Sequence, residues 1–307
     1  MREKSILITG GSGSFGNAFV KAVLPLKPKR LVIYSRSEHL QEQMARAFDD
    51  PCLRFFVGDI RDCKRLEMAM YGIDIVIHAA ALKIVPTCEY NPFEAVQTNI
   101  IGAENVCRAA MDTGVKKVIA LSTDKAVCPL NLYGATKLAA EKIFVAANNL
   151  SAGRTKFSVV RYGNVVGSRG SVVPLFKAQI AQKKMLTITD QRMTRFWITL
   201  DEAVNFVLSC LEMMKGREIF IPKIPSIRIM DLAAAIDPNG KPIFIGIRPG
   251  EKLHEVLLTE DESHLALESW DRFIINPDIS NNTRPGFNYA SNTNTNFLSV
   301  EVLRKML

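Results

Sequence analysis

Short apolar runs rich in valine and isoleucine alternate with longer segments of helical period over the first half of the chain. This alternation is typical of βαβ units, in which helices cover both faces of a parallel sheet. Strands are predicted at residues 5–9, 30–34, 53–57, 73–78, 117–121 and 157–162. The clearest helices are predicted at residues 15–24, 38–48, 92–113 and 133–149. The sequence therefore predicts an α/β fold built on a doubly wound parallel sheet.

The second half of the chain loses this regular alternation. Beyond about residue 164, shorter segments are separated by prolines at positions 174, 222, 225, 242 and 249. We expect a sheet domain over residues 1–165, with about residues 190–220 returning to it, and a smaller, discontinuous lobe over residues 166–307. The stretch 276–296 is dense in Asn, Thr and Ser and is predicted to be a loop or a partly mobile segment.

Composition narrows the possible partners. The 307 residues carry a net charge of +8, from 39 Lys and Arg against 31 Asp and Glu. This excess would attract a phosphate-bearing ligand. Nucleic acid is not expected, because the basic residues form no block and are not interleaved with aromatics. The apolar runs are too short for a signal peptide or a membrane span, and the six cysteines never approach CxxC spacing. We expect a cytoplasmic protein with reduced thiols, no membrane contact and no metal site.

A glycine-rich turn follows the first predicted strand and opens the first helix. The segment Thr9–Gly16 reads TGGSGSFG. Glycine lets the backbone turn tightly and approach a pyrophosphate, whose charge then lies on the free N–H groups of the helix N-terminus. In this context the pattern predicts a Rossmann-type dinucleotide site rather than a simple tight turn. The residues expected to bind the dinucleotide are Gly10, Ser12, Gly13, Ser14, Phe15 and Gly16.

The end of the second strand favours NADP over NAD. An NAD site usually places an acid here, but this chain has Ser35 followed by Arg36. A guanidinium can pair with the oxygens of a 2′-phosphate. The alternative is that Arg36 is an exposed loop base and Glu38 binds the ribose of NAD. After the third strand Asp59 and Ile60 are expected at the adenine, and after the fourth strand Ala79 and Ala80 beside the nicotinamide ribose.

Tyr133 and Lys137 lie four residues apart on one face of a predicted helix. A cation at that distance would lower the pKa of the phenol, so that the tyrosine takes a hydroxyl proton while hydride leaves the same carbon. The alternative is a chance pair on an amphipathic helix. Together with the dinucleotide site, the pair has the pattern of a short-chain dehydrogenase/reductase.

Asp124 and Lys125 follow the fifth strand, where doubly wound sheets place ligand-contacting side chains. A carboxyl could give a proton to a departing oxygen, and an amine could remove a C–H proton next to a carbonyl. This pair indicates proton transfers beyond those of a simple dehydrogenase. The alternative is a plain ion pair at the end of a strand.

Several segments together resemble the soluble inverting UDP-N-acetylglucosamine 4,6-dehydratases, extended short-chain dehydrogenase/reductases that begin pseudaminic acid synthesis. The resemblance runs from Ile6 to about Pro277. The membrane-anchored retaining relatives share the Thr-Asp-Lys segment, but they have a transmembrane region and typically lack the tyrosine found here at Tyr133. The segments that carry the resemblance are TDKA at 123–126, NLYGATK at 131–137, RYGNVVGSRGS at 161–171, MTRFW at 193–197 and RPGEKLHE at 248–255.

The resemblance implies a sequence of steps on one hexose ring. Tyr133, helped by Lys137, would deprotonate the 4-hydroxyl as hydride passes to NADP. Lys125 would then abstract H5 while Asp124 protonates the departing 6-hydroxyl, and Thr123 would hydrogen-bond the 4-oxygen. Return of hydride to C6 and protonation of C5 on the opposite face would give UDP-2-acetamido-2,6-dideoxy-β-L-arabino-hex-4-ulose.

The resemblance also implies which residues bind the substrate and which partners the protein has. Asn164 would bind a phosphate or sugar oxygen, Arg195 and Arg248 the UDP phosphates, and Glu251 the uridine ribose. Lys83 would contact substrate or be a surface lysine, and Arg195 has a structural salt bridge as its alternative. The family implies a homo-oligomer, a hexamer, whose product serves flagellin glycosylation. Two other classes stay open: a nucleotide-sugar epimerase or reductase, which needs no Asp–Lys pair, and a non-catalytic protein that senses NADP or binds nucleic acid.

Overall fold

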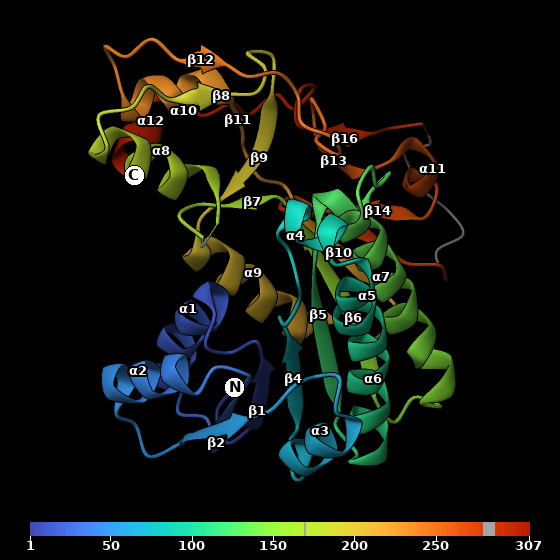
Figure 1. The fold of residues 1–307 in the computed structure, drawn as a ribbon. Helices are drawn as coiled ribbons and strands as arrows, with labels where there is room; N and C mark the ends of the chain where they lie inside the picture. The colour runs from blue at the N-terminus through green and yellow to red at the C-terminus, as the bar shows by residue number, and fades with distance from the viewer. Residues whose placement is uncertain (169, 279–285) are drawn as a thin grey trace.

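A large twisted sheet forms the centre of one half of the molecule (Figure 1). The computed structural model describes residues 1–168, 170–278 and 286–307, so Arg169 of the resemblance and residues 279–285 of the polar stretch lie outside the described residues. Within that part of the chain the sheet has nine strands, in the order β14-β15-β10-β6-β5-β4-β1-β2-β3. The parallel strands are β1 (Ser5–Thr9), β2 (Arg30–Ser35), β3 (Leu53–Val57), β4 (Ile75–His78), β5 (Lys117–Thr123), β6 (Lys156–Tyr162) and β10 (Ile219–Pro222).

The predicted α/β class with a doubly wound parallel sheet is confirmed. All six predicted strands are present, with β4 beginning at Ile75 and β5 running on to Thr123. The sheet is extended by β10 and by an antiparallel hairpin of β14 (Ala266–Glu268) and β15 (Arg272–Ile275), none of which was predicted. Strand β14 exposes two of its three residues, so it lacks the continuous apolar run that marks the central strands.

Helices cover both faces of the sheet. One face carries α1 (Ser14–Val23), α2 (Glu38–Phe48) and α9 (Leu200–Met213), and the other carries α3 (Cys63–Met70), α6 (Gly102–Asp112) and α7 (Leu132–Leu150) (Figure 1). The predicted helix at 92–113 is interrupted. It consists of α5 (Pro92–Val96), a π-helical turn η2 (Gln97–Ile101) and α6. Short α4 (Val85–Tyr90) precedes it, and η1 (Leu24–Leu26) follows α1.

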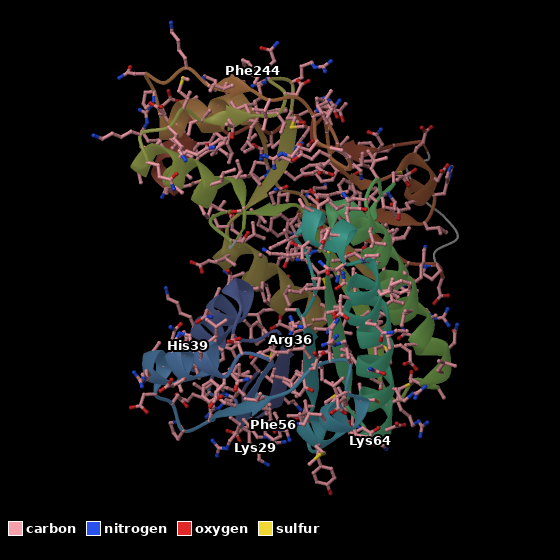
Figure 2. All side chains as sticks on the ribbon, in the orientation of Figure 1. Lys29, Arg36, His39, Phe56, Lys64 and Phe244 are labelled. Atoms are coloured by element: carbon pink, nitrogen blue, oxygen red, sulfur yellow. The ribbon has the colours of Figure 1, made fainter. Side chains whose placement is uncertain are left out.

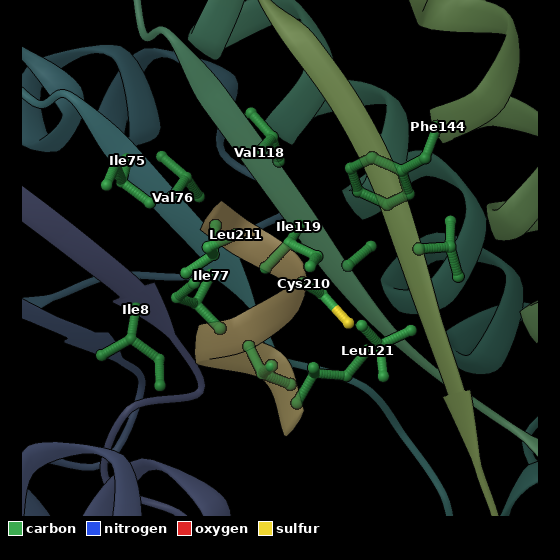
Figure 3. Close-up of a cluster of buried hydrophobic side chains, with 14 of the residues drawn as sticks. Ile8, Ile75, Val76, Ile77, Val118, Ile119, Leu121, Phe144, Cys210 and Leu211 are labelled. Atoms are coloured by element: carbon green, nitrogen blue, oxygen red, sulfur yellow. The ribbon is translucent and has the colours of Figure 1, made fainter. Parts of the chain in front are cut away.

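The main core lies between the sheet and these helices (Figure 3). Ile8, Ile77 and Ile119 are fully buried on adjacent strands, and Cys210 of α9 is buried against them. Burial of the central parallel strands on both faces explains why their sequences are nearly continuous apolar runs.

The second lobe is built from short elements around its own core, which includes Phe176, Trp197 and Ile227. Strands β7 (Asn164–Val165), β9 (Thr194–Ile198) and β11 (Ser226–Arg228) form one small sheet, β8 (Thr187–Ile188) pairs with β12 (Ile243–Phe244), and β13 (Val256–Leu258) pairs with β16 (Tyr289–Ala290). The helices are α8 (Val172–Ala181), α10 (Ile229–Ile236), α11 (Glu260–Ser263) and α12 (Val300–Met306). Among the described residues no helix has both the length and the apolar content for a membrane span.

Candidate active site

A cavity of about 810 Å³ lies where the sheet meets the second lobe. It opens at the carboxyl ends of β1 and β4, the neighbouring strands between which the strand order reverses, and this is where doubly wound sheets bind ligands. Most of the predicted site residues line it: Gly10, Ser12, Gly13, Ser14, Phe15, Ser35, Arg36, Asp59, Ile60, Ala79, Ala80, Lys83, Thr123, Lys125, Tyr133, Lys137, Asn164 and Arg248. Four predicted residues lie outside the lining, namely Gly16, Asp124, Arg195 and Glu251.

The glycine-rich turn leaves no room for a side chain at Gly10 or at Gly16. Gly10 has φ +66°, and a Cβ there would lie 2.9 Å from the backbone of Ala80. A Cβ on Gly16 would lie 1.9 Å from the carbonyl oxygen of Gly11, so Gly16 serves close packing of α1 rather than contact with a ligand. Helix α1 begins at Ser14 without a side-chain hydrogen bond at its cap, Gly13. A glycine at the cap of a helix N-terminus fits a pyrophosphate.

The end of β2 presents a hydroxyl and a guanidinium to the cavity. Ser35 Oγ accepts hydrogen bonds from Ser12 Oγ at 2.9 Å and from Gln41 Nε2 at 3.0 Å. The Arg36 side chain is 56% exposed and lies 3.9 Å from Asp59. Figure 2 shows Arg36 in the half of the molecule that holds the sheet, far from Phe244 of the second lobe. An exposed guanidinium at this position fits a phosphate on the adenosine ribose.

Helix α7 carries the tyrosine and lysine into the cavity. Lys137 is buried and its ammonium donates to the Leu121 carbonyl at 2.7 Å. Burial lowers the pKa of Lys137 to about 8. Burial also raises the pKa of Tyr133 to about 12, and the cation that most opposes this rise is Lys125. The expectation that Lys137 lowers the pKa of this phenol stays a prediction.

Asp124 and Lys125 form a charged cluster beside Tyr133, on the turn η3 (Asp124–Ala126) after β5. Asp124 is fully buried, and its Oδ1 accepts from Lys125 Nζ at 3.0 Å and from Thr123 Oγ1 at 2.9 Å. Lys125 Nζ also lies 3.3 Å from Glu255 Oε1 of the second lobe. Although burial opposes it, the two carboxylates raise the pKa of Lys125, so this lysine rests as an ammonium.

The segment 248–255, called the strap below, attaches the second lobe to the residues that follow β5. Asn131 Nδ2 donates to the Gly250 carbonyl at 2.8 Å, and Lys252 Nζ donates to the Val127 carbonyl. Arg248 from this strap reaches the cavity. The strap thus places side chains of the second lobe next to the charged cluster.

Arg195 and Glu251 are held by this same region. The Arg195 guanidinium donates to the carbonyls of Thr194, Lys252 and Leu253, at 2.7, 3.0 and 3.1 Å. Glu251 Oε2 accepts from the backbone N–H of Arg248 at 3.3 Å. In this structure both residues support the strap, and their roles toward UDP stay predictions.

Two buried acids near the site were given no role from sequence. Glu141 lies one turn beyond Lys137 on α7 and accepts from Ser122 Oγ at 2.5 Å and from Arg161. Its spacing of four residues from Lys137 was a signal that could have found it. Glu255 reaches Lys125 from 130 positions away, and no local spacing announces such a contact.

A glycine-rich turn at a strand switch, with a buried tyrosine and lysine on one face of α7, defines a dinucleotide-dependent enzyme scaffold of the extended short-chain dehydrogenase/reductase type. More narrowly, the chain belongs to the family described as polysaccharide biosynthesis protein, whose sequence model matches residues 6–277.

Individual relatives cover nearly the whole chain. A Campylobacter jejuni protein named UDP-N-acetylglucosamine 4,6-dehydratase (inverting) is 52% identical, over 99% of this chain and 97% of its own. A Rickettsia conorii protein named UDP-glucose 4-epimerase is 47% identical, over 90% of this chain and 84% of its own. The X-ray structure of Pen from Bacillus thuringiensis superposes with a TM-score of 0.93 at 42% identity, covering 99% of this chain and 98% of that one.

Proposed function

We propose that the protein is an NADP-dependent UDP-N-acetylglucosamine 4,6-dehydratase that inverts C5. The observation that carries the proposal is that Lys125 and Tyr133 line one end of the dinucleotide cavity, with Asp124 buried directly behind Lys125. Simple hydride transfer needs no such carboxyl and amine, whereas elimination of water needs both an acid and a base. The Campylobacter relative, which shares the full length of this chain, carries the name of this activity.

The cofactor would be held by the turn at residues 10–16, with Ser35 and Arg36 at the adenosine ribose and Lys137 at the nicotinamide ribose. When bound, NADP supplies a hydride acceptor at the start of the reaction and a hydride donor at its end. The turn fits NADP because the backbones of Gly10 and Ala80 lie in contact there, which leaves no side chain between them.

The side chains of the site supply the proton transfers. Tyr133, in its phenolate form, takes the proton of the sugar 4-hydroxyl, and Thr123 holds the 4-oxygen. The new 4-keto group acidifies H5, which Lys125 removes. Asp124, protonated in the bound state, gives its proton to the departing 6-hydroxyl, so that one water leaves.

The second lobe would bind the nucleotide. Arg248 of this lobe lines the cavity together with Lys83 and Asn164 from residues 1–165, and the two cations suit a diphosphate. Arg195 and Glu251 are proposed to join them at the phosphates and the uridine ribose once substrate is bound. This division assigns the cofactor to residues 1–165 and the nucleotide sugar mainly to residues 166–307.

An epimerase is the second candidate, since the Rickettsia relative carries that name. Mass spectrometry after incubation of the purified protein with UDP-N-acetylglucosamine separates the two. Loss of one water supports the dehydratase, and an isomer of unchanged mass supports the epimerase. Net consumption of NADPH would indicate a reductase.

Two variants connect the activity to the site. Lys125→Ala is expected to abolish loss of water while cofactor binding survives, and Tyr133→Phe is expected to block both reactions. Lys64→Ala and Tyr90→Phe are matched controls, because both side chains are exposed on the surface. Unchanged activity in the two site variants would reject the proposal and favour a non-catalytic binding protein.

The resemblance to the inverting family supports a proposal for the cellular location, the oligomeric state and the partners of the protein. We propose a cytoplasmic homo-oligomer, a hexamer, without nucleic-acid or membrane partners. Its product would enter pseudaminic acid synthesis and flagellin glycosylation. Size-exclusion chromatography with light scattering tests the hexamer.

A further inference from the structure

We propose that Glu255 is a positioning residue for the elimination step, which holds Lys125 against the sugar and accepts its ammonium proton so that the neutral amine can remove H5. The inference rests on the proposed function, because it explains how a lysine that rests as a cation becomes a base.

The contact between the two side chains is short and buried. Glu255 Oε1 lies 3.3 Å from Lys125 Nζ, and Asp124 Oδ1 lies 3.0 Å from the same nitrogen. Glu255 is only 2% exposed, whereas the Lys125 side chain is 25% exposed and lines the cavity. Lys125 therefore lies between the buried side chains of Asp124 and Glu255 on one side and the space where a sugar would lie on the other.

The backbone fixes the direction of the Glu255 side chain. Its N–H donates to Ser291 Oγ at 2.9 Å, and its carbonyl accepts from the Ser291 N–H at 2.8 Å. The next residues form β13, which packs against the turn η3 that carries Lys125. The bonds to Ser291 and the packing of β13 together hold the Glu255 backbone next to Lys125.

Glu255 has capacity to take a proton. Within the described part of the chain its Oε2 is buried without a hydrogen bond, and Lys252 Nζ lies 3.8 Å from it. The charged groups that face Glu255 are Asp124, Lys125, Arg195 and Lys252. Burial raises the pKa of Glu255, Asp124 adds to the rise, and the three cations oppose it without cancelling it.

The proton transfer balances within the cluster. An N–H bond of Lys125 breaks and an O–H bond of Glu255 forms, so an ammonium and a carboxylate become an amine and a carboxylic acid. No net charge is created in the buried site, which avoids a large desolvation cost. Asp124 cannot be the acceptor in the same turnover, because in the proposed reaction it must arrive protonated to serve the departing 6-hydroxyl.

The test is a pH profile of kcat for Glu255→Gln holoenzyme acting on UDP-N-acetylglucosamine in deuterated water. Glutamine keeps the shape but cannot accept the proton. We expect kcat near neutral pH to fall by at least about tenfold and to recover as pH rises, because solvent hydroxide then removes the proton instead. KM is expected to stay within about twofold, transient reduction of the cofactor to persist, and Glu255→Asp to restore part of the rate.

The matched control is Glu268→Gln, which removes a carboxylate paired with Lys223 at 2.8 Å elsewhere in the chain. A Glu255→Gln enzyme with kcat near that of the unchanged protein, or with an equal loss at every pH, overturns the inference. An unchanged protein that releases no water overturns the proposed function instead, and the inference with it.

Discussion

The amide of Asn131 donates a hydrogen bond to the carbonyl of Gly250 at 2.8 Å, joining the start of α7 to the strap of the second lobe. The same side chain accepts from the Gly134 N–H at 2.8 Å and so caps the helix that carries Tyr133. Asn131 therefore both caps α7 and links this helix to the second lobe.

Replacing Asn131 by alanine removes both bonds. We expect the free energy of unfolding to fall by about 2 kcal/mol, about half from the cap and half from the contact with Gly250. Urea denaturation measures the loss. Ser299→Ala is the control, because it removes the cap of α12 together with a local contact to Glu301, and it is expected to cost about 1 kcal/mol. Equal losses in the two variants would show that the bond to Gly250 contributes nothing.

Burial of Lys137 makes a pH-dependent contribution to stability. Its pKa is lowered from 10.5 to about 8, so the unfolded chain holds this proton more tightly than the folded protein does. The group therefore destabilises the fold below about pH 8, and this cost disappears as pH rises toward 10.5. Lys137→Met lacks this cost, so below about pH 8 its free energy of unfolding gains relative to that of the unchanged protein. We expect this gain to disappear as pH rises from about 8 to 10.5.

Urea denaturation of the cofactor-free proteins across this pH range measures the difference. Loss of the hydrogen bond to Leu121 changes the free energy of unfolding by the same amount at every pH. Lys64→Met is the control, because this lysine is 88% exposed and its substitution has no such pH dependence. A constant difference between Lys137→Met and the unchanged protein would contradict the lowered pKa.

Arg36 should decide between the two dinucleotides. Arg36→Ala is expected to weaken NADP binding by about tenfold to a hundredfold, the value of a hydrogen bond to a charged group, and to leave NAD binding unchanged. Titration calorimetry measures both affinities. Arg46→Ala is the control, since this arginine lies exposed on α2 and pairs only locally with Glu42. Tighter binding of NAD by the unchanged protein would favour the alternative in which Glu38 holds the ribose.

Arg161 links α7 to the second lobe inside the protein. It pairs with Glu141 at 2.7 Å and with Glu262 at 3.0 Å, and it donates to the Leu257 carbonyl at 2.9 Å. Arg161→Leu removes the ion-pair partner of buried Glu141 and of partly exposed Glu262, and it is expected to cost about 3–5 kcal/mol in urea denaturation. Arg192→Leu breaks an exposed pair with Asp190 and is expected to leave stability unchanged. Equal effects would contradict the structural role of Arg161.

Local patterns predicted the central strands, the glycine-rich turn and the tyrosine–lysine pair, because each depends on residues close together in sequence. The contact of Glu255 with Lys125 and the attachment of Gly250 to Asn131 depend on how distant segments pack. The π-helical turn at Gln97–Ile101 was missed because its apolar residues fit the helical period on either side. The exposed strand β14 was missed because it has no apolar run.

The most direct test of the account is an NMR spectrum of the fresh product formed from UDP-N-acetylglucosamine by the NADP-loaded protein in deuterated water. The account predicts a 4-keto sugar with a methyl group at C6, deuterium at C5 and the L-arabino configuration. A product that retains its 6-hydroxyl and carries no deuterium at C5 would contradict it.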